Sequence, residues 1–460
     1  MAWAERYGKQ GKWRARYTKP DGTTGSEPGF RTKRAAESWG NAEEEKMKGG
    51  DWADPKLLGT PFETWAEEWY EAQDLAETTM SNYRSTLDSM ILPHWVGWGT
   101  GSIKPINIAG WTKKLRAEGY KPSSIATAHA RMYTLMEDAV DNGYARKNPC
   151  DHKRKRGKRS DNAPTSSEEE VWTTPLGALL VAERCGVLGG RDEDFLFPLT
   201  IAYTGMRLGE AIGLEKRYAR AKLHGLIRVE WQLVEVRGHF YRRPPKGDGR
   251  RDIQLPPFLV DLIADQIAAI DKNFCACDEP HDDRPREYTF LGPGSGHHRR
   301  SNYYRRQFTP AVEGMRPVRD GERAPVYVSY EESSWPGAPV VGRNSAGRAE
   351  AAWLPVEPGL TPHGLRHSHK TWMLEDHIPE IAQFERLGHT MGGIRGVYSH
   401  ASDDMRQAIL TGLQRRWEES LSARAAISPR SAVPLLDRLL REHQAAAHLK
   451  GSVAEIAKAG

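Results

Sequence analysis

A block of positive charge between residues 146 and 160 most strongly constrains how this chain folds. Eight of these fifteen residues are Lys or Arg, and Asp151 is the one acid among them. Such a block repels itself and stays extended until a polyanion neutralises it. A solvated linker without a partner is one interpretation. We favour a linker between two folded parts that both contact DNA, and the basic residues expected to contact it are Lys153, Arg154, Lys155 and Arg156.

The composition is that of a globular protein. The chain has 460 residues, enough for about three domains. Apolar residues make up 38% and charged residues 28%, and no run of 18 apolar residues occurs. The first residues lack the apolar core of a signal peptide, and four unpatterned cysteines suit a reducing compartment. We therefore expect a cytoplasmic protein without a membrane partner, whose net charge of +5 matters less than its distribution.

Residues 1–50 predict a small β-sheet with one helix. Apolar and basic residues alternate from Trp13 to Tyr17, so Arg14 and Arg16 should share one face of a strand. Thr32 is placed to cap a helix. The face is either the solvated side of an ordinary domain or a nucleic-acid-binding surface, and we favour the second.

Two further domains, a linker and a tail are expected downstream. Residues 60–148 show helical spacing of apolar residues and predict an all-α bundle, and the basic linker extends over 149–164. Residues 165–425 predict a larger mixed α+β domain, followed by a C-terminal tail at 426–460. In the large domain, one half-buried strand is expected over 227–233, and two more strands should form a hairpin whose turn presents Lys246. Residues 316–358 predict a surface insertion.

Six residues of the large domain stand out by their order. Arg207 lies in the segment Thr204–Glu210, and Lys246 follows. His363 and Arg366 are three residues apart, so a helix beginning at Pro362 places them on one face. His389 follows a Leu-Gly pair, and Tyr398 comes nine residues later. Each alone has an ordinary interpretation, as a surface ion pair, a turn lysine, a cap or a core residue.

The ordered set resembles the tyrosine recombinases, the phage-integrase family. The resemblance implies a multidomain fold with a β-sheet-plus-helix N-terminal module that binds arm-type DNA, an all-α core-binding bundle and a mixed α+β catalytic domain. It implies a site-specific recombinase, an integrase of a phage or other mobile element, that cleaves and rejoins DNA. It implies Tyr398 as the nucleophile, and Arg207, Lys246, His363, Arg366 and His389 as the activating residues. Lys246 and His363 are 117 residues apart, farther than in compact family members.

The residue types suit this chemistry. A tyrosine phenol forms a 3′-phosphotyrosyl intermediate, and two arginines bind phosphate oxygens as charge develops. A lysine protonates the departing 5′-oxygen, and histidines accept the tyrosine proton or bind the phosphate. We expect no cofactor and no metal. The implied partners are duplex attachment sites and a homotetramer on DNA, with room for an excisionase or a host DNA-bending factor.

Two other functions stay open at this point. A type IB topoisomerase-like enzyme uses similar chemistry, and a DNA-binding architectural protein would carry a degenerate catalytic domain. Cys275 and Cys277 with His281 resemble half of a zinc site, although a plain surface loop explains them better. Arg299, Arg300, Arg305 and Arg306 are either DNA-backbone contacts or a solvated face.

Overall fold

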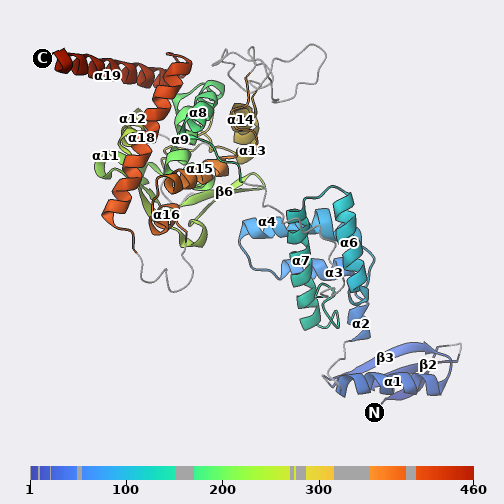
Figure 1. The fold of residues 1–460 in the computed structure, drawn as a ribbon. Helices are drawn as coiled ribbons and strands as arrows, with labels where there is room; N and C mark the ends of the chain where they lie inside the picture. The colour runs from blue at the N-terminus through green and yellow to red at the C-terminus, as the bar shows by residue number, and fades with distance from the viewer. Residues whose placement is uncertain are drawn as a thin grey trace, which may run out of the picture. The chain divides into compact units, whose positions relative to one another are not determined.

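A computed structural model describes most of the chain (Figure 1). The described residues are 2–8, 11–20, 22–48, 54–151, 170–269, 274–275, 286–314, 353–389 and 400–459. The chain divides into two compact units, Met1–Asn162 and Ala163–Gly460.

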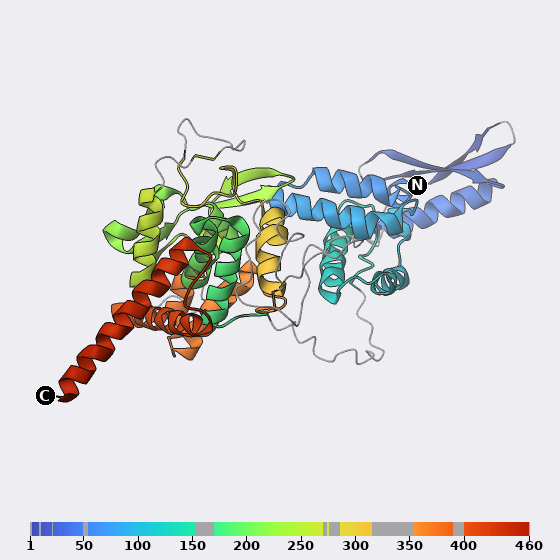
Figure 2. The same ribbon diagram turned by 90° about the horizontal axis from the view of Figure 1, so that it is seen from above.

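The first unit begins with an antiparallel sheet in the order β1-β2-β3, covered on one face by α1 (Figure 2). These elements are β1 (Trp3–Tyr7), β2 (Lys12–Thr18), β3 (Thr24–Phe30) and α1 (Lys33–Lys48). Ala15 and Tyr17 are buried, and the Tyr17 ring meets Trp39 of α1 edge to face at 5.6 Å. The Ala35 amide donates to Thr32 Oγ1, 3.1 Å away. The expected strand and its helix cap are therefore confirmed.

A helical bundle follows in the same unit. Its elements are α2 (Pro55–Leu58), α3 (Phe62–Glu71), α4 (Glu77–Thr86), the π-helical turn η1 (Leu87–Ile91), α5 (Leu92–Trp95), η2 (Thr100–Ser102), α6 (Pro105–Ala117) and α7 (Pro122–Asp141). Indole rings fill much of its core. Trp111 donates to the Met90 carbonyl at 2.9 Å and Trp65 to the Leu135 carbonyl at 3.2 Å. These buried donors are satisfied while their rings pack, so the predicted all-α character of this stretch is confirmed.

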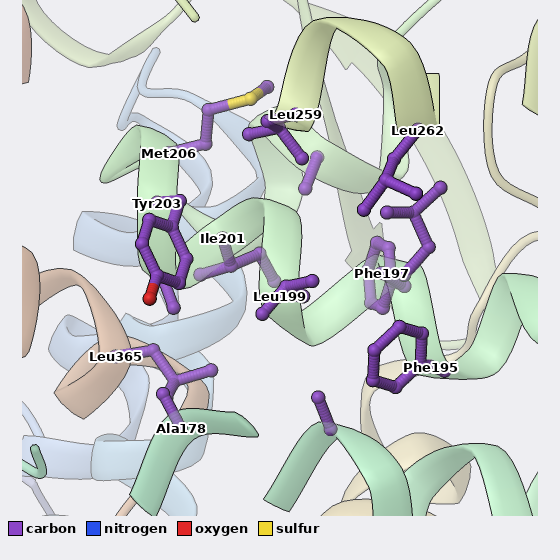
Figure 3. Packing of buried hydrophobic residues seen from close by; sticks show 14 of the residues in the cluster. Ala178, Phe195, Phe197, Leu199, Ile201, Tyr203, Met206, Leu259, Leu262 and Leu365 are labelled. Carbon is purple, nitrogen blue, oxygen red and sulfur yellow. The ribbon is translucent and has the colours of Figure 1, made fainter. Parts of the chain in front are cut away.

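The second unit is built around α9, which is buried along almost its whole length. Figure 3 shows Leu199 and Ile201 of α9 between Leu259 of α12 and Leu365 of α15. The helices are α8 (Pro175–Gly189), α9 (Asp192–Thr204), α10 (Leu208–Ile212), η3 (Lys216–Tyr218), α11 (Ala221–His224), α12 (Pro257–Ala269), α13 (Arg300–Tyr303), η5 (Tyr304–Phe308), α14 (Thr309–Glu313), α15 (Pro362–Glu375), α16 (Glu380–Leu387), α18 (Asp403–Ile427) and α19 (Pro434–Ala459).

Two small sheets replace the single one that the sequence predicts. One has the order β4-β5-β8, and the other pairs β6 with β7. The strands are β4 (Ala219–Arg220), β5 (Leu226–Val229), β6 (Gln232–Val236), β7 (His239–Arg243) and β8 (Arg251–Gln254). The expected strand over 227–233 is thus wrong, because the chain leaves one sheet at Glu230–Trp231 and enters the other. The Arg242 guanidinium carbon lies 3.6 Å from the centroid of the Trp231 ring.

The ends of the expected surface insertion lie together. Arg184 of α8 is buried and donates to the Ala311 carbonyl at 3.1 Å and the Leu354 carbonyl at 2.6 Å. The Val356 amide also donates to the Val312 carbonyl at 2.9 Å. Residues 315–352 lie outside the described part of the chain, so the nature of 316–358 stays a prediction, as do the domain boundaries.

A buried ion pair fixes the C-terminal segment on the second unit. Arg424 of α18 and Glu183 of α8 are both fully buried and meet through two contacts of 2.6 Å. Arg424 also donates to the Ser428 carbonyl at 2.7 Å, and Ser431 Oγ donates to Glu183 at 2.6 Å. The first turns of α19 add Leu436 and Leu440 to the core. The residues after 426 are therefore partly a core element rather than only a tail.

This pair predicts an unequal response to two conservative changes. Glu183→Gln leaves the Arg424 charge buried without its carboxylate, so the free energy of unfolding of the second unit should fall by about 3–5 kcal/mol. Pulse proteolysis in urea, following fragments of the second unit, measures this. Glu419→Gln removes an exposed partner of Arg415 and should cost about 0–1 kcal/mol. Equal effects of the two changes would contradict the assigned role.

Candidate active site

The turn between α9 and α10 carries the first expected site residue. Gly205 ends α9 with a left-handed backbone (φ 67°), and a Cβ there would lie 2.7 Å from a Leu387 methyl carbon and 2.9 Å from His369 Cδ2. Glycine is therefore required for both conformation and space. The chain then places Arg207 directly before α10.

A buried carboxylate holds Arg207 in place. Glu210 has no exposed surface in its side chain, and its Oε1 lies 2.8 Å from Arg207 Nη1. Glu210 also pairs with the buried Arg251, whose Nη2 lies 2.8 Å from Oε2. Burial raises the pKa of Glu210, but Arg251 and Arg207 outweigh it, so the pKa is lowered and the group is ionised. Arg207 keeps 22% of its side chain exposed, so it can reach a ligand.

Arg366 is brought to the same turn by α15. Thr361 Oγ1 caps this helix by accepting from the Gly364 amide at 3.0 Å, and Pro362 occupies its first turn, as expected. Arg366 is 3% exposed and donates to the Gly205 carbonyl and, at 2.6 Å, to the Leu387 carbonyl. Burial, then Arg207 and Arg251, lower its pKa to about 9, which leaves the guanidinium charged at neutral pH.

His389 follows α16 and reaches Arg366. Gly388 ends α16 with a left-handed backbone (φ 65°), and His389 Nε2 then lies 2.9 Å from Arg366 Nη2. Burial, then the nearby Arg366 and Arg207, lower the pKa of His389 to about 4. The imidazole is therefore neutral at pH 7, and its Nε2 accepts from Arg366.

His363 lies exposed one helical turn before Arg366. Its pKa is lowered by burial, then by His367 and Arg366. It lines a groove of about 720 Å³ together with Arg300 and Tyr304. His363 and Arg366 thus both lie on α15, but the imidazole is exposed and the guanidinium is buried.

Lys246 lies in the connection between β7 and β8 and is exposed. β7 and β8 belong to different sheets, so the expected hairpin is wrong, and Lys246 stands in a loop between two sheets. That loop lies beside the His389 turn, because a Cβ on Gly249 would be 3.3 Å from the Gly388 carbonyl oxygen. The structure thus brings the loop of Lys246 to the segment that carries His389.

Three further buried residues complete the cluster. Arg251 donates to the Arg386 carbonyl at 2.8 Å. Arg386 donates to His369 Nε2 at 2.8 Å, the Gln254 carbonyl at 2.9 Å and the Tyr203 carbonyl at 3.1 Å. The other nitrogen of His369 lies 2.9 Å from the Ala202 carbonyl, so it carries the proton. Apart from the Arg386–His369 bond, these contacts join residues more than 130 positions apart, and no local pattern could reveal them.

Several expected residues lie outside the described ranges. These are Lys153, Arg154, Lys155, Arg156, Cys277, His281 and Tyr398. Within the described ranges, no group of three or more His, Cys, Asp or Glu residues is placed to hold a metal ion. None of the described helices combines the length and hydropathy needed to cross a membrane.

The arrangement suits a phosphate group. Among the described residues, the Glu210 carboxylate pairs with Arg207 and Arg251, while the guanidiniums of Arg366 and Arg386 bond to the Gly205 carbonyl and to His369. Arg366 has five N–H donors, and the described contacts use three of them. A site with surplus positive charge and remaining donors favours an oxyanion that gains charge during a reaction.

Known proteins share both the sequence and this fold. No model of a protein family matches the chain. The chain is 26% identical over 400 residues to a protein named as the prophage phiRv2 integrase, in two strains of Mycobacterium tuberculosis, and the match covers 85% of this chain and 89% of the relative. Structures of the Tn1549 transposon integrase with circular intermediate DNA match with a TM-score of 0.54 and 17% identity, over 77% of this chain and 98% of theirs.

The predicted resemblance to the tyrosine recombinases is confirmed. A second Tn1549 integrase structure, in complex with transposon right end DNA, matches with a TM-score of 0.52 and 16% identity, over 77% of this chain and 98% of that one. The fold class expected from the sequence is therefore that of the tyrosine recombinases, with the two-sheet arrangement described above.

The neutral state of His389 predicts how any cleavage of DNA at this cluster depends on pH. The rate constant at low DNA concentration reports groups of the free enzyme. It should stay level as the pH falls through 6.5, because the pKa values of His363 and His389 are both lowered, and it should decline at lower pH as these groups gain protons; toward pH 4 His389 can no longer accept from Arg366.

The comparison is with His389→Gln, whose amide oxygen can accept the same bond without titrating. It should lose the part of the decline that lies near pH 4 and keep the part that comes from His363. A decline of the unmodified enzyme near pH 6.5 that this variant removes would contradict the assigned state of His389.

Proposed function

We propose that this chain is a site-specific DNA recombinase, an integrase that cleaves and rejoins duplex DNA through a 3′-phosphotyrosyl intermediate. The observation that carries this is that Arg366, bonded to His389, also bonds to the Gly205 turn that leads into Arg207, which the buried Glu210 holds in place. The relatives support it, since one is named as a prophage integrase and another is a transposon integrase seen with DNA. Integration and excision of a phage or other mobile element in the cytoplasm is the corresponding role.

The chemistry conserves bond energy by exchanging one phosphodiester for another. The Tyr398 phenol oxygen attacks the scissile phosphorus, and the bond to the 5′-oxygen breaks. Arg207 and the remaining donors of Arg366 bind the non-bridging oxygens as the five-coordinate phosphorane gains charge. Lys246 gives its proton to the departing 5′-oxygen, and His363 accepts the proton of the phenol. A 5′-hydroxyl then reverses these steps and releases the tyrosine.

His389 acts in this scheme as a positioning residue. Its neutral Nε2 accepts from Arg366 and leaves the guanidinium plane fixed against the Leu387 carbonyl. A fixed guanidinium loses less conformational entropy when it binds the phosphate. No cofactor takes part in this scheme.

The other parts of the chain serve DNA binding and assembly. The N-terminal sheet binds arm-type DNA, the helical bundle binds the core site, and Lys153, Arg154, Lys155 and Arg156 neutralise phosphates between them. Recombination joins two duplexes with four cleavages, so the active form is a homotetramer on DNA. An excisionase or a host DNA-bending factor would set the direction of the reaction.

Removal of the nucleophile tests this function directly. Tyr398→Phe deletes one hydroxyl, so DNA binding should persist while the covalent adduct with nicked attachment DNA disappears from denaturing gels. The control is Tyr218→Phe, which removes the hydroxyl of a tyrosine in η3 and should still form the adduct. An adduct on the Tyr398→Phe protein, or one mapped to another tyrosine, would reject the assignment.

A sulfur substrate separates the lysine from the arginines. Lys246→Ala should slow cleavage because the 5′-oxygen then leaves without a proton, whereas loss of a donor such as Arg207 costs about 10²–10³ in rate through the phosphorane. A bridging 5′-sulfur leaves without protonation. It should therefore restore cleavage by Lys246→Ala and not by Arg207→Ala, measured in single-turnover assays. Failure of both variants on the sulfur substrate would exclude Lys246 as the acid.

A further inference from the structure

The N-terminal sheet has one open face that combines basic and aromatic side chains. Trp3 pairs with Arg16 and Glu5 pairs with Arg14 across β1 and β2, so these four side chains share a face. Ala15 and Tyr17 point to the opposite face, which α1 covers. Trp3 is 44% exposed, so the first face is open to solvent.

A carboxylate stands in the middle of this face. Glu5 Oε1 lies 3.0 Å from Arg16 Nη2 and 3.4 Å from Arg14 Nη1. The guanidinium of Arg14 also lies 4.0 Å from the centroid of the Tyr7 ring. The hydrogen bond from Arg16 is the main cause that lowers the pKa of Glu5, so the carboxylate is ionised at neutral pH. One acid thus orients both arginines.

Such a carboxylate opposes indiscriminate binding to the DNA backbone. A face that only neutralises phosphates gains from every positive charge and loses from a negative one. Base edges in the major groove present a different pattern, because guanine offers two acceptors to an arginine and the amino group of cytosine donates to a carboxylate. Two oriented guanidiniums beside one carboxylate match a G·C-containing base sequence better than they match phosphates.

We propose that Glu5 is a specificity-determining residue of this face, which orients Arg14 and Arg16 toward guanine, accepts from cytosine and repels the backbone of unrelated DNA. The inference rests on the proposed arm-binding function of residues 1–50. It goes beyond that function by naming the residue that converts a basic face from general affinity to sequence selection.

The experiment uses the full chain carrying Tyr398→Phe, so that DNA is bound and not cut. Selection from a random duplex library gives the bound motifs, and the arm motif is the one lost when residues 1–50 are deleted. Affinities are then measured at several salt concentrations for an arm-motif duplex and for an unrelated duplex. The variant is Glu5→Gln, and its control is Glu37→Gln, an acid of α1 that pairs with Lys33 at 3.6 Å.

Glu5→Gln should weaken binding to the arm motif by about 5- to 150-fold, the value of one specific base contact. It should tighten binding to the unrelated duplex and steepen the salt dependence by about one counterion. Glu5→Asp keeps the charge at a shorter reach, so it should lose affinity for the motif while still binding unrelated DNA weakly. Glu37→Gln should leave both affinities unchanged.

The outcomes separate this inference from the function it rests on. If Glu5→Gln weakens binding to both duplexes equally, the role of Glu5 is structural and the inference fails. The inference also fails if the variant selects the same motif and binds both duplexes with unchanged affinity. If deletion of residues 1–50 removes no motif from the unmodified chain, the proposed arm-binding function itself fails.

Discussion

The fold of the second unit depends on the hydrogen-bond acceptors of its buried guanidinium groups. Burying a charged group is costly unless it is paired and fully hydrogen-bonded. Glu210 supplies the carboxylate, and Arg366 and Arg386 meet backbone carbonyls at the end of α9, at β8 and at the end of α16. Because each acceptor belongs to a segment that bears a site residue, satisfying the arginines also sets the positions of Arg207, Lys246 and His389.

The same network leaves the site short of negative charge. Burial lowers the pKa of Arg366 and Arg386 to about 9, and each also lies close enough to Arg251 for repulsion to contribute. Both remain charged at neutral pH, so the described residues of the cluster carry more positive than negative charge, which favours binding of an anion. In the proposed reaction a phosphorane carries more charge than the phosphodiester from which it forms, so it would gain more from this field than the phosphodiester does.

Local chemistry explains why part of this site could be predicted from the sequence. The helix start at Pro362 is a short-range signal, and it correctly predicts one helix that carries both His363 and Arg366. Arg251, Arg386 and His369 gave no such signal, because their partners lie far along the chain. The single strand predicted over 227–233 is wrong for a related reason. Apolar and polar residues keep alternating through Trp231, although the chain passes there from one sheet to the other. Periodicity does not show which strand is the partner.

Glu210 and Glu5 have the same structural role in two different environments. Each carboxylate orients two arginines, but Glu210 is buried among further guanidiniums, whereas Glu5 is 41% exposed on a face where it offsets one of the charges it orients. An excess of guanidinium binds any phosphate and so carries no sequence information. In the function proposed above, the cluster around Glu210 therefore gives no sequence selection, and selection falls to surfaces where acid and base are nearly balanced, as proposed for the open face of the N-terminal sheet.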